Sequence, residues 1–207
     1  MEFTLILIIC CIVAYLMGSI PTSIWIGKGY YGIDVREHGS QNPGASNTFR
    51  VLGRKTGIVV LLIDTLKGFL AVMLIYWFSG GYEGNLIPWQ LLCGLLAVLG
   101  HLFPVFANFS GGKGVATLLG VVLALHPLSA LAALALFLIL LVATRQVAVG
   151  SIGGALLYPS ILYWGFNWQE PFLLTFALLM AALVIVTHRS NIKRLVKGEE
   201  NKVNLFN

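Results

Sequence analysis

Seven apolar stretches, joined by short polar connections, make up most of this 207-residue chain. They cover about residues 3–27, 57–79, 86–107, 115–126, 128–143, 151–166 and 171–187. A helix needs roughly 20 apolar residues to cross the hydrocarbon of a bilayer, and the fourth and fifth stretches are short by this measure. With 58% hydrophobic and 10% charged residues, the chain cannot form a water-soluble globule with an ordinary surface. The sequence therefore predicts an all-α integral membrane protein with about seven transmembrane helices, two of them short, in a single polytopic membrane domain over residues 1–207.

The number of spans depends on His126-Pro127, which lies between the fourth and fifth stretches. A chain reversal at this pair gives seven helices, whereas a proline kink within one long helix gives six. Seven spans with the N-terminus outside place every Lys and Arg on one side of the membrane, whereas six spans place Arg145 and the basic tail opposite the first loop. Because basic loops favour the cytoplasm, we predict seven spans, a cytoplasmic C-terminus and a short basic cytoplasmic tail at about residues 189–207. The net charge of +5 also favours contact with anionic lipid headgroups.

The first stretch begins with Met1-Glu2 rather than with basic residues, and it contains no convincing small-residue cleavage site. We therefore expect a retained helix and not a signal peptide. Cys10 and Cys11 are neighbours in this helix, and Cys93 lies in another predicted helix, so the three thiols offer neither a disulfide framework nor a metal-ligand spacing. We interpret them as packing residues and expect no metal and no cofactor.

A glycine-rich stretch, Ser110-Gly111-Gly112-Lys113-Gly114, carries the only charge between Glu83 and Arg145. The glycines allow consecutive backbone N–H groups to turn towards one point, and a helix predicted to begin at Val115 adds the positive end of its dipole. These features are typical of a phosphate-binding cradle, although the spacing is not that of a Walker A loop. The alternative is a glycine-rich turn whose lysine extends to the membrane surface.

The loop Gly39–Arg50 is the longest of the predicted inner connections. Its Asn42-Pro43-Gly44 triplet predicts a turn, and Ala45-Ser46-Asn47-Thr48 offers N-caps for a helix that continues towards Leu52. Such a loop can present hydroxyls, amides and the Arg50 guanidinium to a small polar ligand. The alternative is an ordinary solvated turn, because Ser, Asn and Gly are common in all loops.

Two further inner connections carry polar side chains. Arg145 ends one predicted helix and Ser151 starts the next, and a membrane-edge arginine with a capping serine explains them equally well. His188 and Asn191 share a helix face where the last stretch leaves the membrane, which is also typical of a basic headgroup anchor. If the helices pack as one bundle, these residues, the long loop and the glycine-rich stretch converge on a positively charged pocket that opens to the cytoplasm and the lipid.

Three ionisable residues fall within or beside the predicted spans. Asp64 and Lys67 are one helical turn apart near the start of the second span, and we expect a structural ion pair. His101 lies near the inner end of the third span. A buried histidine that is hydrogen-bonded across helices is favoured there over a ligand or a base.

The pattern leaves more than one class of function open. An enzyme acting on a phosphorylated substrate and an organic-phosphate transporter or flippase both fit, and a scaffolding protein is a third possibility. The one-sided distribution of polar residues and the absence of a visible inverted repeat argue against a transporter. No histidine is followed by aspartate five positions later, which disfavours the His-x-x-x-x-Asp mechanism of thioester-dependent acyltransferases. Nucleic-acid binding is excluded because the basic residues are spread over membrane-edge loops.

The combination of motifs resembles the bacterial membrane acyl-phosphate:glycerol-3-phosphate acyltransferase family (PlsY). The motifs cover nearly the whole chain in order: Tyr15-x-x-Gly18-Ser19-Ile20-Pro21, Gly39-Ser40-x-Asn42-x-Gly44-Ala45-x-Asn47 with Arg50, Asp64-x-x-Lys67-Gly68, Gly100-His101-x-x-Pro104-Val105-Phe106, Gly111-Gly112-Lys113-Gly114-Val115-Ala116-Thr117 and His188-Arg189-x-Asn191-Ile192-x-Arg194-Leu195. This resemblance implies a multi-pass enzyme of the bacterial cytoplasmic (inner) membrane, with its active site facing the cytoplasm. It implies transfer of a fatty acyl group from acyl phosphate to the sn-1 hydroxyl of glycerol 3-phosphate, which gives lysophosphatidic acid and phosphate in the first acylation step of phospholipid biosynthesis.

The resemblance also implies the residues of the site. Lys113, His188 and Asn191 would be catalytic. His188 would be a general base or a donor to phosphate, and in the second case the substrate's own phosphate would take the proton. The residues expected to bind the substrates and their phosphates are Ser40, Asn42, Gly44, Asn47, Arg50, Gly111, Gly112, Lys113, Gly114, Ser151, His188 and Asn191. Two departures from the family pattern, at Ala148 and Glu199, leave those positions without an assigned role. The expected partners are the two substrates, the lipid bilayer and the enzyme that makes acyl phosphate.

Overall fold

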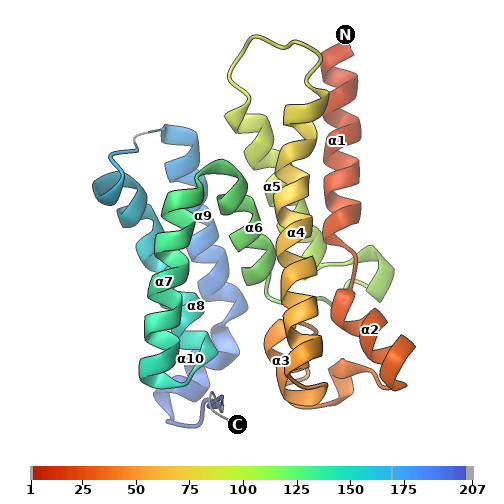
Figure 1. Ribbon diagram of the computed structural model, residues 1–207, viewed down its shortest axis with the longest axis vertical. Coiled ribbons are helices and arrows are strands. Elements are labelled where there is room, and N and C mark those ends of the chain that lie inside the picture. Colours follow the sequence, from red (N-terminus) through yellow and green to blue (C-terminus); the bar gives the residue numbers. More distant parts are fainter. Residues whose placement is uncertain (1, 169, 204–207) are drawn as a thin grey trace. The chain divides into compact units, whose positions relative to one another are not determined.

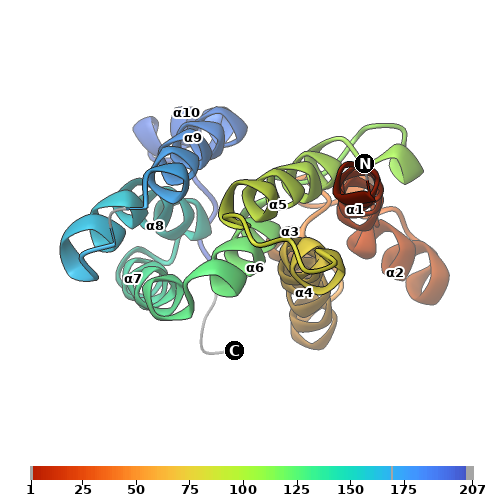
Figure 2. The same cartoon turned by 90° about the horizontal axis from the view of Figure 1, so that it is seen from above.

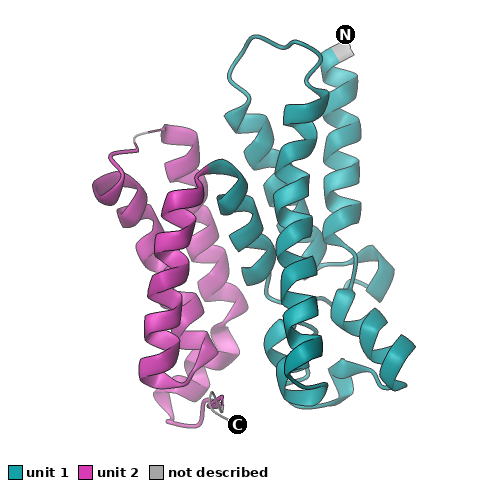
Figure 3. Cartoon of the chain, in the orientation of Figure 1, with its two compact units in different colours: residues 1–125 teal, residues 126–207 magenta. Residues whose placement is uncertain are grey.

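Helices are the only regular elements in the part of the chain that the computed structural model describes, residues 2–168 and 170–203 (Figure 1; Figure 2). They are ten α-helices, two short 3-10 helices and a short π-helix. The chain divides into two compact units, residues 1–125 and residues 126–207 (Figure 3). This confirms the predicted all-α class, whereas a single membrane domain stays a prediction.

Three long helices form the body of the first unit. The elements of this unit are α1 (Glu2–Gly18), α2 (Thr22–Tyr31), η1 (Val35–Glu37), α3 (Ala45–Val51), α4 (Arg54–Phe78), α5 (Ile87–Leu102), η2 (Val105–Ala107) and α6 (Val115–Leu125). Helices α1, α4 and α5 pack side by side (Figure 1; Figure 2). Small side chains fill the core between them: Cys10, Ala14, Ala71, Cys93 and Ala97 lie there with Ile75. The predicted packing role of Cys10 and Cys93 is thus confirmed.

Helix α6 crosses α4 at very short range, and glycines make this crossing possible. A Cβ atom on Gly68 would overlap the carbonyl oxygen of Thr117, and one on Gly120 would overlap that of Thr65. Small residues let helix backbones approach closely within a membrane. The crossing therefore fixes the position of α6, which begins at Val115, two residues after Lys113.

The first apolar stretch is not one helix through residue 27, as the sequence predicts, but two helices. Helix α1 ends at Gly18, and α2 starts at Thr22 after a bend of 44°. Pro21 explains the break, because it has no backbone N–H and disfavours helical geometry at the preceding Ile20. The buried Lys67 stabilises the opened backbone, since its Nζ donates to the Ile20 carbonyl at 3.1 Å.

The second unit contains α7 (Pro127–Thr144), α8 (Val147–Ser160), η3 (Ile161–Gly165), α9 (Pro171–Thr187) and α10 (Arg189–Val196). Helix α8 packs against both α7 and α9. A buried hydrogen bond of 3.1 Å between the hydroxyls of Ser129 and Tyr158 also joins α7 to α8. The chain bends by 63° between α9 and the basic helix α10.

Each of the seven apolar stretches contains a helix. The number of helices that could cross a membrane is smaller than seven when it is judged by length and hydropathy. Among the described residues, four helices are long and apolar enough to cross a membrane, or up to six if each bent pair is one span, and α6 is a shorter apolar helix. The His126-Pro127 pair separates α6 from α7. Pro127 is the first residue of α7, and the His126 side chain caps it by accepting a hydrogen bond from the Ser129 N–H at 3.2 Å. The exact span count and the orientation of the termini stay predictions.

Candidate active site

The predicted site residues occur in both units. The first unit carries Ser40, Asn42, Gly44, Asn47, Arg50, Gly111, Gly112, Lys113 and Gly114, and the second carries Ser151, His188 and Asn191. Nearly all of these residues lie in loops or in the first or last turn of a helix. Polar loops next to apolar helices are where a membrane enzyme can meet a charged substrate.

The side chain of Asn47 organises the loop that carries Ser40. Its amide oxygen accepts from the Ser40 N–H at 2.7 Å, and its amide nitrogen donates to the carbonyls of Val35 at 2.8 Å and His38 at 3.0 Å. The residue is only 1% exposed. The expectation that this stretch supplies a helix N-cap is wrong, because α3 already begins at Ala45 with Gly44 as its N-cap. Asn47 therefore determines where Ser40 lies.

Ser40 and Arg50 are exposed at the two ends of this loop. Arg50 lies in the last turn of α3, and its Cδ would be 3.5 Å from a Cβ atom on Gly39. The hydroxyl and the guanidinium thus come from neighbouring parts of one loop. Between them, the Gly44 N–H donates to the carbonyl of Asn42 at 2.9 Å and forms the predicted turn.

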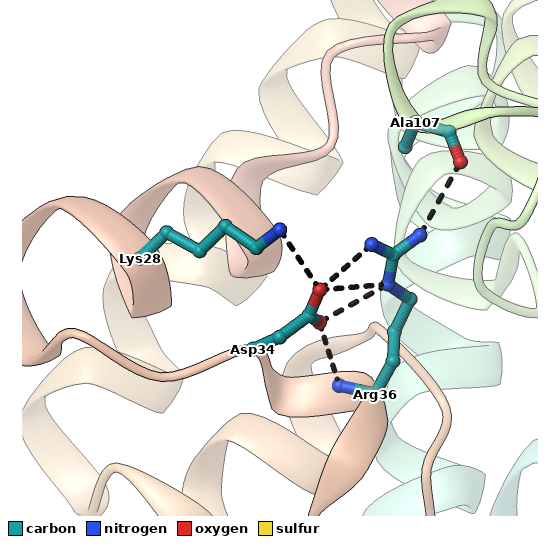
Figure 4. A network of polar contacts seen from close by, with 4 residues as sticks. All are labelled: Lys28, Asp34, Arg36 and Ala107. Carbon is teal, nitrogen blue, oxygen red and sulfur yellow. Dashed lines mark hydrogen bonds and ion pairs between the residues drawn. The ribbon is translucent and has the colours of Figure 1, made fainter.

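A charged cluster fixes the start of the same loop (Figure 4). The Arg36 guanidinium donates to the Asp34 carboxylate, with Nη2 at 2.7 Å from Oδ2, and also to the carbonyl of Ala107 at 3.3 Å. Lys28 adds a second cation at 3.1 Å from Asp34 Oδ2. The hydrogen bond from Arg36 lowers the pKa of Asp34 well below its usual range, and Asp34 in turn raises the pKa of Arg36. The cluster joins the loop that carries Ser40 to the segment that leads to Lys113.

The glycine-rich stretch differs from the predicted backbone cradle. The N–H groups of Gly111 and Gly112 donate to the carbonyls of Leu102 at 3.2 Å and His101 at 3.1 Å. These hydrogen bonds hold the stretch to the end of α5. The sequence predicts that the two N–H groups point at a common anion, and this prediction is wrong for Gly111 and Gly112. The basic group of this stretch is the half-buried Lys113, which is separated from the first residue of α6, Val115, by Gly114 alone. A helix N-terminus and a lysine still favour an anion.

Gly114 allows the chain to enter α6 from this stretch. Its φ angle of 81° lies in the left-handed region that favours glycine. A Cβ atom at this position would also be 2.7 Å from Leu102 Cδ1 and 3.1 Å from Val98 Cγ1. The Gly114 carbonyl then accepts from the Leu118 N–H at 2.7 Å, the hydrogen bond of the first helical turn.

The glycine-rich stretch and the long loop meet in the first unit. A Cβ atom on Gly112 would lie 3.0 Å from the carbonyl oxygen of Pro43, which is close to the limit of van der Waals contact. Pro43 lies between Ser40 and Arg50 in sequence, and Gly112 precedes Lys113. The structure therefore brings together two of the polar segments that the sequence predicts to form one site.

His188 connects α9 to α10 in the second unit and is 3% exposed. Its Nδ1 lies 2.9 Å from the carbonyl oxygen of Val184. A carbonyl oxygen only accepts hydrogen bonds, so Nδ1 carries a proton and the neutral ring has its lone pair on Nε2. In that form Nε2 accepts a proton, whereas donation from Nε2 requires the imidazolium.

Asn191 is held by Glu200, a residue that the sequence analysis does not include in the site. The Asn191 amide nitrogen donates to Glu200 Oε1 at 2.7 Å, and Arg194 Nε donates to Oε2 at 2.8 Å. A Schellman turn brings the carboxylate back to α10: the N–H of Glu199 bonds the Arg194 carbonyl, and that of Gly198 bonds the Leu195 carbonyl. A glycine just after a helical segment is the signal in the sequence that predicts such a turn.

The beginning of the C-terminal tail packs on the connection between α7 and α8. The Val203 N–H donates to the Arg145 carbonyl at 2.7 Å, and Gln146 Nε2 lies 3.5 Å from the carbonyl oxygen of Glu200. The sequence predicts that Ser151 starts a helix. This prediction is wrong, because α8 begins at Val147 and Ser151 is buried one turn inside it.

Fold and site define a multi-pass helical membrane protein whose loops carry lysine, arginine, hydroxyl and imidazole groups suited to phosphorylated ligands. Known proteins agree with this class. The family model described as glycerol-3-phosphate acyltransferase matches residues 8–198. A glycerol-3-phosphate acyltransferase of Trichlorobacter lovleyi is 51% identical over 91% of this chain and 93% of its own length. One from Listeria monocytogenes is 44% identical, with 97% of this chain and 98% of the relative covered.

Solved structures show the same relationship. The glycerol 3-phosphate form of PlsY (YgiH), an integral membrane glycerol 3-phosphate acyltransferase, is 38% identical to this chain and superposes with a TM-score of 0.88, covering 97% of this chain and 99% of its own. The lysophosphatidic acid form of PlsY superposes with a TM-score of 0.83 over 96% of this chain and 95% of its own. The chain belongs to the glycerol-3-phosphate acyltransferase family, which confirms the resemblance read from its motifs.

Proposed function

We propose that this protein transfers a fatty acyl group from acyl phosphate to the sn-1 hydroxyl of glycerol 3-phosphate. The products are lysophosphatidic acid and inorganic phosphate, and the reaction is the first acylation step of phospholipid biosynthesis. The observation that carries the proposal is the likeness, at 38% identity over nearly the whole chain, to PlsY structures in glycerol 3-phosphate and lysophosphatidic acid forms.

The chemistry of the polar residues supports acyl phosphate as the donor. The substrate hydroxyl oxygen attacks the acyl carbonyl carbon, the carbonyl carbon to phosphate oxygen bond breaks, and phosphate leaves with the electron pair. Cations stabilise the charge that develops on this leaving group. Because phosphate is a good leaving group, positioning of the two substrates supplies much of the rate enhancement.

In the first unit, Lys113 binds a substrate phosphate, assisted by Arg50 and Ser40. Lys113 provides a formal charge at the N-terminus of α6, where the helix dipole adds to it. Arg50 and Ser40 lie on the loop that touches the glycine-rich stretch through Pro43 and Gly112. This arrangement supplies three donors for phosphate oxygens from two adjoining segments.

In the second unit, His188 acts as the general base and Asn191 orients a substrate. The hydrogen bond between His188 Nδ1 and the Val184 carbonyl supports the base role, because it holds the proton of the neutral ring on Nδ1 and so makes Nε2 the basic nitrogen. The alternative role predicted from the sequence, a donor to phosphate, requires a protonated ring. Glu200 fixes the amide of Asn191, and Ser151 adds a hydroxyl from α8.

The expected location is the bacterial cytoplasmic membrane, with the active site facing the cytoplasm. The one-sided distribution of Lys and Arg supports this orientation. The acyl chain stays between helices in the lipid while the phosphates are bound at the inner surface. The enzyme that makes acyl phosphate is a candidate partner, because its product is amphiphilic and partitions into the same leaflet.

The deciding experiment offers three acyl donors to the purified protein. Labelled glycerol 3-phosphate is supplied with acyl phosphate, acyl-CoA or acyl-carrier protein, and lysophosphatidic acid is measured by chromatography. We expect product from acyl phosphate alone and its loss in a folded Lys113→Ala variant. Absence of product with every donor, from a folded protein that moves labelled glycerol 3-phosphate into vesicles, would favour an organic-phosphate transporter or flippase instead.

A further inference from the structure

A buried polar cluster on α4, α2 and α5 has no part in the proposed chemistry. Asp64 and Lys67 are 2% and 4% exposed, and Asp64 Oδ1 lies 2.9 Å from Lys67 Nζ. The same carboxylate oxygen accepts from the Thr22 hydroxyl at 3.0 Å and lies 3.8 Å from His101 Nδ1. A buried ion pair is often no more stabilising than apolar side chains of the same volume. Its more specific effect here is that one carboxylate joins α4 to α2 by a hydrogen bond and lies beside a side chain of α5.

Lys67 and Asp64 together hold the break between α1 and α2. Lys67 Nζ donates to the carbonyl of Ile20, the residue just before Pro21, and Asp64 binds the first side chain of α2, Thr22. The Ile20 carbonyl also accepts from the Thr22 N–H at 3.0 Å, so Lys67 adds a second hydrogen bond to it. Loss of Asp64 would leave the buried Thr22 hydroxyl without this acceptor, which is costly in an apolar environment.

His101 connects this cluster to the glycine-rich stretch. A Cβ atom on Gly112 would overlap His101 Nε2, so the imidazole lies directly on the Gly112 backbone. The His101 carbonyl accepts from the Gly112 N–H at 3.1 Å. The carbonyl oxygen of Pro43 lies on the same side of Gly112, 3.0 Å from that Cβ position. The residue before Lys113 is therefore packed against both the His101 ring and one loop carbonyl.

A small pocket marks the place where these segments converge. Its lining includes Pro21, Thr22, Pro43, Asp64, His101 and Gly112. The break between α1 and α2, the loop that carries Ser40 and the glycine-rich stretch therefore all border the same buried carboxylate.

We propose that Asp64, Lys67 and His101 are positioning residues for phosphate binding. The Asp64 carboxylate lies beside the His101 ring, the ring packs on Gly112 next to the Pro43 carbonyl, and this packing sets the position of Lys113 relative to the loop of Ser40 and Arg50. The inference rests on the proposed function, because it requires that Lys113 binds a phosphate. It assigns these three residues a role in substrate affinity in addition to packing.

The contact between His101 and Gly112 is tested by a double-mutant cycle. Gly112→Ala places a methyl group against the ring, and we expect the KM for at least one of the two substrates to rise tenfold or more. His101→Ala opens the space that this methyl group needs, so the double variant should recover at least half of the loss in logarithmic terms. Independent, additive effects of the two substitutions would overturn the proposed coupling.

The role of the Asp64 carboxylate in substrate binding is tested with a variant that leaves no buried charge without a counter-ion. Asp64→Asn alone buries the Lys67 ammonium without its counter-ion and is expected to impair folding, so Asp64→Asn is combined with Lys67→Met. Val60→Ala is the matched control, because it removes packing from a fully buried position one turn earlier on α4. Both proteins should unfold at similar temperatures. Only the double variant Asp64→Asn/Lys67→Met, the charge-free pair, should raise a substrate KM, by tenfold or more.

An outcome in which both KM values of the charge-free pair stay within threefold of the wild type would overturn the positioning role. If the wild type makes no lysophosphatidic acid from any donor, the proposed function fails, and inorganic phosphate binding measured by calorimetry takes the place of KM. Weaker phosphate binding in the charge-free pair than in Val60→Ala would then support the inference. Equal binding in the two, or no phosphate binding by the wild type, would reject it.

Discussion

The amide nitrogen of Asn191 lies 2.7 Å from Oε1 of the buried Glu200 carboxylate. Because Arg194 occupies the other carboxylate oxygen, Glu200 holds one amide orientation of Asn191 and connects the tail to α10. Glu200→Gln keeps the shape and removes the charge. A hydrogen bond to a charged group is worth about 1.5–3 kcal/mol, so we expect kcat/KM to fall roughly tenfold or more. Steady-state assays with acyl phosphate measure this effect.

Glu199→Gln is the matched control for this prediction, since Glu199 is adjacent to Glu200 but exposed. It should change kcat/KM by less than twofold. Equal losses in the two variants would show that the charge of the tail matters and not the specific contact with Asn191.

His188→Ala is expected to lower kcat by about 10²–10⁴-fold, the usual contribution of a positioned general base. The reason is the protonated Nδ1, which bonds the Val184 carbonyl and leaves Nε2 as the acceptor. His126→Ala serves for comparison, because His126 caps α7 through the Ser129 N–H. Loss of a cap costs about 0.5–2 kcal/mol of stability, so this second variant should unfold at a lower temperature and keep its kcat. A full kcat in His188→Ala would refute the base role.

The sequence was sufficient for the helices but not for the break within the first of them. The length of an apolar stretch predicts a membrane span but gives no sign of a break in its backbone, so the sequence predicts one helix over residues 3–27. The break depends on Lys67, whose side chain reaches Ile20 from 47 positions away in sequence. Periodicity describes neighbours along the chain and cannot report such a contact.

The same limit explains what was missed in the site. The glycines of the Gly111-Gly112 pair were interpreted as a source of N–H donors, whereas these donors bond the end of α5 and the missing Cβ atoms make room for His101 and its carbonyl. A pair of glycines in the sequence indicates that another group packs closely against the backbone. It does not identify that group. Glu200 was missed because its partners lie nine and six positions earlier, across a turn that a glycine signals only weakly.

The cluster at Asp34 predicts a pH dependence of stability. Its pKa is well below the ordinary value because Arg36 and Lys28 bind the carboxylate. A lowered pKa in the folded state means that the unfolded chain binds a proton first, so the stabilisation is complete above about pH 5 and is lost as the pH falls through about 3.9 and below. The difference in unfolding temperature between the wild type and Asp34→Asn should therefore be large at pH 7 and shrink below pH 4 in thermal melts.

Glu37→Gln provides the control for that series, because Glu37 is an exposed carboxylate three residues further along. Its difference from the wild type should remain small at every pH. A difference for Asp34→Asn that grows on acidification would have the wrong sign for an ionised, paired carboxylate and would contradict the assignment.

Asn47→Ala should destabilise the first unit and also impair substrate binding. The substitution removes three hydrogen bonds, to the Ser40 N–H and to the carbonyls of Val35 and His38. Buried groups left without partners cost about 1–3 kcal/mol each, and partial relaxation of the loop brings the expected total to roughly 2–4 kcal/mol. Ser46→Ala, on the same short helix, should stay within about 0.5 kcal/mol of the wild type. Because Ser40 depends on the Asn47 side chain for its place, the KM for a phosphate substrate should rise in Asn47→Ala even at temperatures where the variant is fully folded. An unchanged KM under those conditions would mean that Ser40 keeps its position without this amide, or that it does not contact the substrate.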